Sequence, residues 1–261
     1  MTGAGLETAT DQGRPAATIV ILRDVQAGPA QLLMMERAAT MAFAAGAIVF
    51  PGGGVDDTDR ALAAAFAGEY ELDEAAARIA AIRETLEECG LGVGLTGPVD
   101  GEVLAAVRAG LGAGQALGDL LAARGIGLAL DQLVPFARWH PAKGEKMTRV
   151  YDARFYLARA PEDQVARADA SENVALFWRS AAEMLAGYRA GAHHIIFPTL
   201  RNLERLAQFE RFDQLAAHAL AIPVEKVRPW IEEREGERFL CIPSHLGYPV
   251  CAELMAGIVR Y

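Results

Sequence analysis

The segment from Glu74 to Cys89 constrains the fold more than any other part of the sequence. Ile79, Ile82 and Leu86 recur at spacings of three and four residues, which predicts a helix with one buried face. Gly90 follows at the position where helices often end in the left-handed conformation. Because such a helix must bury its apolar face, the rest of the chain has to supply a sheet or other helices as a partner surface.

Short runs rich in β-branched residues, Leu and Met predict a sheet as that partner. The strands that we expect are 16–23, 31–36, 47–50, 132–139, 148–158 and 174–178. Pro51 to Gly54 stops the third strand, and we expect its three successive glycines to weaken any regular element. Strands mixed with helices predict an α/β (α+β) fold, with a mixed sheet sandwiched between helices.

Further helices are expected at about 61–67, at 102–124 as one helix or a pair, at 181–188 and at 199–220. Two apolar runs near the end, 227–233 and 238–242, fit a hairpin or two short extensions. For the domains, we expect a flexible tail over 1–14, a main domain over 15–180 with an insertion at about 55–73, and a mainly helical C-terminal extension over 181–261.

Composition narrows the classes of function. The chain has 261 residues and a formal net charge of -9, so we expect no broad positive surface for nucleic acid. Three widely spaced cysteines indicate a reducing compartment, and we expect a cytoplasmic protein. The apolar runs are too short to cross a bilayer, so no membrane partner is expected. A homodimer is left open.

Three glutamates of the predicted helix carry its chemistry. Glu84, Glu87 and Glu88 stand at positions i, i+3 and i+4, so their carboxylates share one face. Clustered negative charges need a positive partner, and Mg²⁺ or Mn²⁺ prefers such oxygens. A bound cation would bridge diphosphate oxygens and lower the pKa of an attacking water. The alternative is an ordinary solvated helix face, where most glutamates lie.

The wider string resembles the nudix box. Phe50 to Gly53, followed by Arg83 to Leu91, is similar to the Gly-Gly turn and the Arg-Glu-apolar-x-Glu-Glu-x-Gly-apolar core of that box. Thr85 stands where an aliphatic residue is usual. The resemblance implies a nudix fold and a nudix hydrolase that cleaves the diphosphate bond of a small-molecule nucleotide derivative.

The resemblance also implies roles for single residues. Arg83, Glu84, Glu87 and Glu88 are the catalytic candidates, and the three glutamates are the metal ligands. The carbonyl of Gly53 is a further candidate ligand, and Arg83 braces the carboxylates. Which glutamate acts as a general base stays open.

The first half of the box departs from the usual pattern. Its usual glutamate lies eight positions before the arginine, where this chain has Ala75, with Glu74 one residue away. The separation from Gly53 to Arg83 is longer than usual by about sixteen residues, which predicts an insertion. A role for the first glutamate is therefore open.

Several segments are similar to the branch of the family that includes the peroxisomal nudix coenzyme A diphosphatase. They are Arg37, 43–53, 77–84, 139–141, 149–156 and 197–199. This likeness implies coenzyme A or acyl-coenzyme A as the favoured substrate, although Ala42 and Ala44 stand where other coenzyme A families have an Arg and a His. The alternatives are ADP-ribose, NADH or dinucleoside polyphosphates, and a nudix-fold ligand-binding or regulatory module without catalysis.

Residues outside the box complete the candidate site. Glu172, with Asp169 second, is the candidate for the acidic residue that many nudix enzymes carry after the box. The candidate substrate contacts are Arg37, His140, Lys143, Lys146 and Arg149. For all of these, an ordinary solvated loop residue is the alternative.

Overall fold

The structure is a computed structural model that describes residues 13–38, 45–141, 150–168 and 173–257. Within these residues an eight-stranded mixed sheet has the order β10-β7-β8-β1-β2-β3, with β4 paired to β1 and β9 paired to β2. Its strands are β1 (Arg14–Arg23), β2 (Gln31–Arg37), β3 (Ile48–Val49), β4 (Gly52–Gly54), β7 (Val134–Trp139), β8 (Tyr151–Arg159), β9 (Asn173–Ser180) and β10 (Lys226–Val227).

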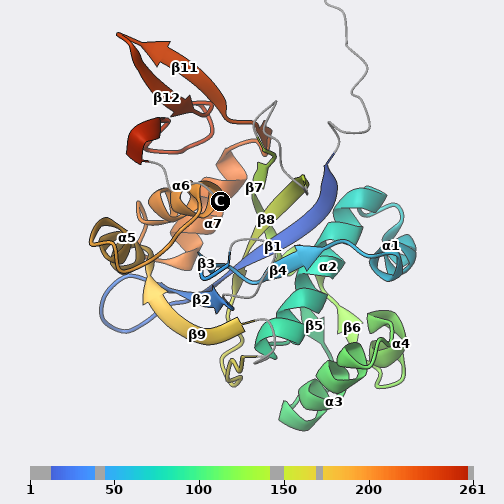
Figure 1. The fold of residues 1–261 in the computed structure, drawn as a ribbon. Coiled ribbons are helices and arrows are strands. Elements are labelled where there is room, and N and C mark those ends of the chain that lie inside the picture. The colour runs from blue at the N-terminus through green and yellow to red at the C-terminus, as the bar shows by residue number, and fades with distance from the viewer. Residues whose placement is uncertain (1–12, 39–44, 142–149, 169–172, 258–261) are drawn as a thin grey trace, which may run out of the picture.

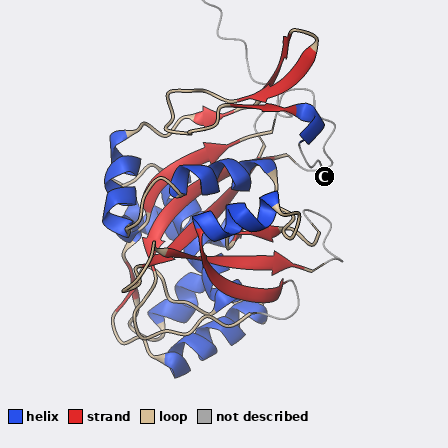
Figure 2. Cartoon of the chain, turned by 90° about the vertical axis from the view of Figure 1, so that its left-hand side faces the viewer, coloured by secondary structure: helices blue, strands red, loops and turns tan. Residues whose placement is uncertain are grey.

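Helices cover both faces of this sheet (Figures 1 and 2). One face carries α1 (Asp57–Ala63), the 3-10 turns η2 (Ala64–Phe66) and η3 (Leu130–Gln132), α2 (Leu72–Cys89), α3 (Gly101–Gly112), α4 (Leu117–Ala122) and the small sheet of β5 (Leu95–Thr96) and β6 (Gly127–Leu128). The other face carries α5 (Ala181–Arg189), α6 (Phe197–Leu206) and α7 (Phe212–Ala221). A mixed sheet between helices confirms the predicted fold class.

Each face of the sheet builds its own hydrophobic core. In β1, Ile19 and Ile21 pack on the side of α2, whereas Val20 and Leu22 pack on the side of α6 and α7. Because both faces of β1 are covered, the strand is a continuous apolar run and does not alternate with polar residues. Each such side chain stabilises the fold by roughly 1.5–3 kcal/mol.

The third strand ends at Val49, before Pro51, as predicted, but the glycine run forms a short strand of its own, β4, which was not predicted. Gly52 pairs with Thr18 and Gly53 with Ala17 in antiparallel register. A Cβ on residue 52, where φ is 154°, would overlap the carbonyl oxygen of Ala17. Only glycine lets the two backbones approach this closely, and the gain in pairing overrides its weak strand preference.

The segment 199–220 was predicted as one helix, and this prediction is wrong, because the segment contains the two helices α6 and α7. Between α6 and α7, Nη1 of Arg211 donates to the carbonyls of Val25 at 2.9 Å and Gly28 at 3.0 Å in the β1–β2 turn. This docking onto the turn redirects the chain. By contrast, the segment 102–124, for which one helix or a pair was predicted, contains the pair α3 and α4.

The final residues build a separate three-stranded sheet of β11 (Trp230–Arg234), β12 (Glu237–Cys241) and β13 (Ala252–Leu254), followed by η4 (Met255–Gly257). The hairpin β11–β12 was one of the two predicted alternatives, and it projects from the top of the molecule in Figures 1 and 2. None of the described helices combines the length and apolar character needed to cross a membrane. The domain limits stay predictions, although α6 and α7 share a core with the main sheet.

Gly52→Ala is expected to destabilise the protein, because the new methyl group would overlap β1. Overpacking of this kind costs about 1–3 kcal/mol, and the melting temperature falls by about 2–4 °C per kcal/mol in a chain of this size. Gly54→Ala is the matched control in the same strand, since a Cβ there meets no atom within 4 Å. Equal melting temperatures for the two variants, measured by calorimetry, would contradict the close approach of β4 to β1.

Candidate active site

The last two turns of α2 carry the three glutamates and lie beside β4 (Figure 1). The side chains of Glu84 and Glu87 are 16% and 35% exposed, and Glu88 is buried. The backbone N–H of Gly52 donates to Oε2 of Glu88 at 2.8 Å, and a Cβ on residue 53 would overlap the carboxylate of Glu84. The glycine strand therefore lies directly against the acidic face.

Thr85 fits the buried position where the box usually has an aliphatic residue. Its side chain is fully buried, and its hydroxyl donates to the carbonyl of Ala81 at 2.7 Å within the same helix. The hydroxyl is thus satisfied locally, which removes the cost of an unpaired polar group in the core.

Burial has a clear electrostatic effect on the acidic face. It raises the pKa of Glu84 to about 7, against the lowering effect of Arg83, and the charge of Glu87 adds to the rise. The charged form of Glu84 is therefore costly here. A further positive charge near this carboxylate would remove that cost.

Arg83 is the buried positive charge between these groups. Its Nη1 donates to Glu84 Oε1 at 2.9 Å and to Glu87 Oε1 at 3.2 Å, and its Nη2 donates to the carbonyl of Gly54 at 2.8 Å. Burial alone would lower the pKa of Arg83, but the bonds to Asp59 and the charges of Glu84 and Glu87 raise it above its ordinary value.

Asp59 completes this arrangement, and the sequence did not reveal it. The side chain is 1% exposed, and its two oxygens accept from Nε and Nη2 of Arg83, each at 3.0 Å. Asp59 lies in α1, within the segment expected to be an insertion. The signal was present: the usual box places its first acid six positions after the glycine, and six positions after Gly53 is Asp59.

Ala75 and Glu74 take no part in this arrangement, so the spacing counted backward from Arg83 was misleading. Ala75 is fully buried in the core beside the sheet. Glu74 accepts from Arg78 at 2.9 Å and from the hydroxyl of Tyr156 at 3.1 Å. It lies roughly 15 Å from Glu84 along the helix axis, at 1.5 Å per residue.

The structure places Arg37 near the acidic helix and His140 away from it. The sulfur of Cys89, the last residue of α2, lies 3.6 Å from the sulfur of Met35 in β2, so the face of β2 that carries Met35 packs against α2. Arg37 is two residues further along β2, on the same face. Its Nε is buried without a hydrogen-bond partner among the described residues. His140 packs against Gly13, which precedes Ala17 by four residues. Because Ala17 is the partner of Gly53, His140 lies roughly 13 Å along β1 from the glycine strand.

The remaining predicted site residues lie outside the described part of the chain. They are Lys143, Lys146, Arg149, Asp169 and Glu172. Their roles stay predictions.

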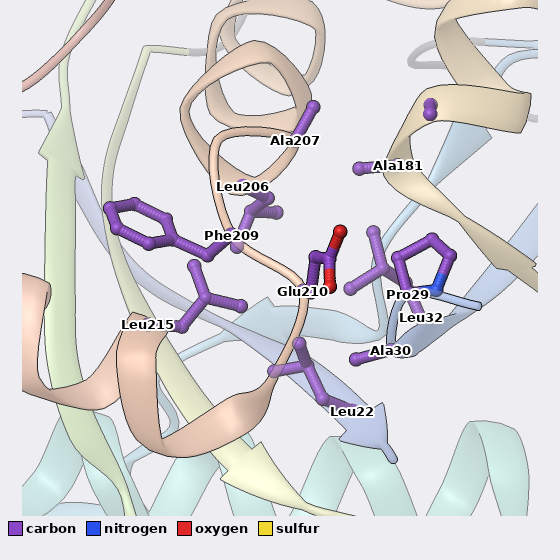
Figure 3. Close-up of a pocket in the computed structure, with 11 residues that line it drawn as sticks. Leu22, Pro29, Ala30, Leu32, Ala181, Leu206, Ala207, Phe209, Glu210 and Leu215 are labelled. Carbon is purple, nitrogen blue, oxygen red and sulfur yellow. The ribbon is translucent and has the colours of Figure 1, made fainter. Parts of the chain in front are cut away.

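A cavity of about 210 Å³ lies elsewhere, on the face of the sheet opposite α2 (Figure 3). Leu22, Leu206 and Leu215 line it from β1, α6 and α7, and Glu210 is its one charged group among the described residues. This lining is apolar and acidic, so it does not suit an anionic nucleotide.

Comparison with solved structures shows which proteins this fold is similar to. The chain is similar to the crystal structure of a nudix hydrolase from Alicyclobacillus acidocaldarius, with 27% identity over 79% of this chain and 96% of that one, at a TM-score of 0.68. Weaker likenesses include the nudix domain of Shewanella oneidensis NrtR complexed with ADP ribose (12% identity, 78% and 96% coverage, TM-score 0.43). Another is a C. elegans Ap4A hydrolase (16% identity, 78% and 93% coverage, TM-score 0.36).

No protein-family model and no curated protein matches the chain. The mixed sheet, the glycine strand against an acidic helix and the Alicyclobacillus likeness together support a nudix fold and a nudix hydrolase enzyme.

Asp59→Asn is expected to destabilise the protein, because it removes one partner of a buried ion pair, a change that costs about 3–5 kcal/mol. The cost should be at the lower end, about 3 kcal/mol, since Arg83 still pairs with Glu84 and Glu87. The melting temperature should fall by about 6–12 °C in calorimetry. Asp57→Asn, an exposed change in the same helix, should leave it almost unchanged. If the two variants melt together, the Asp59–Arg83 pair does not hold α1 to α2.

Proposed function

We propose that this chain is a metal-dependent hydrolase that cleaves the diphosphate linkage of a nucleoside diphosphate derivative, with coenzyme A or acyl-coenzyme A as the favoured substrate. The carrying observation is the acidic face of α2 packed against β4, with Glu84 at a pKa of about 7. Carboxylates held in this way attract a hard cation such as Mg²⁺ or Mn²⁺.

The donor chemistry fits such a cation. Glu84, Glu87 and Glu88 supply the carboxylate oxygens. The carbonyl of Gly53 is a further candidate ligand, and because Gly53 has no Cβ, it leaves room for the carboxylate of Glu84. Among the described residues, no three acidic, His or Cys side chains already converge as a cage. Arg83 instead holds Glu84 and Glu87, so a cation would share these carboxylates with the guanidinium.

When bound, the cation would offset the charge of the diphosphate and lower the pKa of a water molecule. The residues of the chain hold and orient the groups around it. Arg83 and Asp59 fix the direction of Glu84 and Glu87, and the N–H of Gly52 fixes Glu88. Glu172 is proposed as a further acid in the same reaction.

The substrate class rests on segment likeness and on local charge. Because the chain carries a net charge of -9, an anionic substrate needs local positive groups. Arg37, near the end of α2, is the described candidate. We propose it as a phosphate contact, together with Lys143, Lys146 and Arg149, in a protein whose partner is a small-molecule nucleotide derivative.

The test is product analysis by mass spectrometry, with Mg²⁺, with Mn²⁺ and with a chelator. The compounds are coenzyme A, acetyl-coenzyme A, ADP-ribose, NADH and diadenosine tetraphosphate. Coenzyme A should yield adenosine 3',5'-bisphosphate and phosphopantetheine, and the chelator should abolish both products. Glu87→Gln and Glu88→Gln should lose activity by at least about 100-fold, since they remove proposed cation ligands, whereas Glu102→Gln on the exposed surface of α3 should not.

Each result decides between substrates or functions. Metal-dependent cleavage of another compound keeps the reaction and replaces the substrate. Turnover that survives the chelator excludes the metal, and no turnover of any compound would favour a ligand-binding module.

Arg37→Gln is expected to lower kcat/KM about tenfold, the equivalent of 1.4 kcal/mol, because one charge-assisted contact to phosphate is lost. Steady-state kinetics on the best substrate measures this change. Arg60→Gln is the control, since Arg60 is another half-buried arginine and pairs with Asp73 at 2.6 Å. Unchanged kcat/KM in Arg37→Gln would remove Arg37 from the substrate site.

A further inference from the structure

The C-terminal end of α2 has an unusual set of hydrogen-bond partners. The last four carbonyls of a helix have no partner within the helix and must find one elsewhere. In α2 these carbonyls belong to Leu86, Glu87, Glu88 and Cys89. The N–H of Gly90 donates to the first at 3.0 Å, and the N–H of Arg167 donates to the last at 2.8 Å.

One side chain, Arg108, satisfies the two carbonyls in between. Its Nε donates to the carbonyl of Glu87 at 2.9 Å, and its Nη2 donates to the carbonyl of Glu88 at 3.2 Å. These are the backbones of two of the three proposed cation ligands. The guanidinium also lies against the helix end at Gly90, where a Cβ would lie 3.2 Å from Nη1.

The element that carries Arg108 is anchored independently of the site. Helix α3 buries Leu104, Val107 and Leu111 in the core on the α2 side of the sheet. Arg108 itself is half-buried and points from this anchored helix to the end of α2. A contact from a fixed helix restrains the last turn of α2, which loops alone would leave free to fray.

We propose that Arg108 is a positioning residue of this nudix site, which fixes the last turn of α2 so that Glu87 and Glu88 face the cation. The proposal rests on the proposed function, because it concerns the same cation ligands. Two further physical points support it. A positive group at a helix C-terminus opposes the partial negative charge of the exposed carbonyls. A guanidinium presents two N–H groups in one plane, so it can hold two neighbouring carbonyls, which a lysine ammonium on a flexible stem does less well.

The test is direct binding of Mn²⁺, followed by electron paramagnetic resonance of the free ion, beside the melting temperature of each variant. Arg108→Gln should raise the Kd for Mn²⁺ about tenfold, the low end of the effect of groups that orient metal ligands. Arg108→Lys should fall between this variant and the unchanged protein. Arg124→Gln is the matched control, since Nη1 of Arg124 donates to a helix carbonyl as well, that of Leu120 in α4 at 2.8 Å.

Kinetics against metal concentration adds a second readout. In Arg108→Gln, turnover of the best substrate should need about tenfold more Mn²⁺ and should recover at saturating metal, because the ligands are displaced but present. A Kd for Mn²⁺ within twofold of that of Arg124→Gln would overturn the proposal and leave Arg108 with a purely stabilising role. If the unchanged protein binds no Mn²⁺, the proposed metal dependence itself fails.

Discussion

The buried guanidinium of Arg83 is the interaction on which the site depends. It joins three elements, because it donates to Asp59 of α1, to Glu84 and Glu87 of α2, and to the carbonyl of Gly54 in β4. A buried charge that loses its partners costs several kcal/mol, so the three elements are stable together and costly to separate. An ammonium would not serve equally well, since the planar fork of arginine holds both oxygens of Asp59 while its other nitrogen reaches the acidic face.

The site also depends on the close approach of the backbone of β4 to β1 and to helix α2. The sheet can reach the acidic helix only because Gly52 and Gly53 lack a Cβ on the side of β1 and of Glu84. The helix contributes small residues as well, with Ala76 and Ala80 fully buried in the core on that side. A larger side chain at these places would push α2 away from the sheet and take the carboxylates out of reach of β4.

Local patterns predicted the parts of this arrangement that depend on near neighbours. The periodicity of Ile79, Ile82 and Leu86 predicted helix α2, and the spacing of the glutamates predicted its acidic face. The pairing of Asp59 with Arg83 spans 24 residues and depends on how α1 packs, so counting backward from Arg83 missed it, although the spacing from Gly53 marks the position. The same reason explains why β4 was not predicted: glycine has a poor strand preference on its own, and its place in the sheet follows from the shape of β1.

The positive groups that hold the glutamates in place differ from those that would bind a phosphate group of the substrate. Arg83 and Arg108, two arginines that bond to the side chains or the backbone of these glutamates, both donate to acceptors of the protein itself. They hold carboxylates and carbonyls in place, so they are not the groups that attract a phosphate. In a chain with a net charge of -9, the proposed cation on the glutamates and basic groups on other elements, such as Arg37 in β2, would supply that attraction. In the proposed hydrolase, helix α2 can therefore stay constant while the surrounding elements set the choice of substrate.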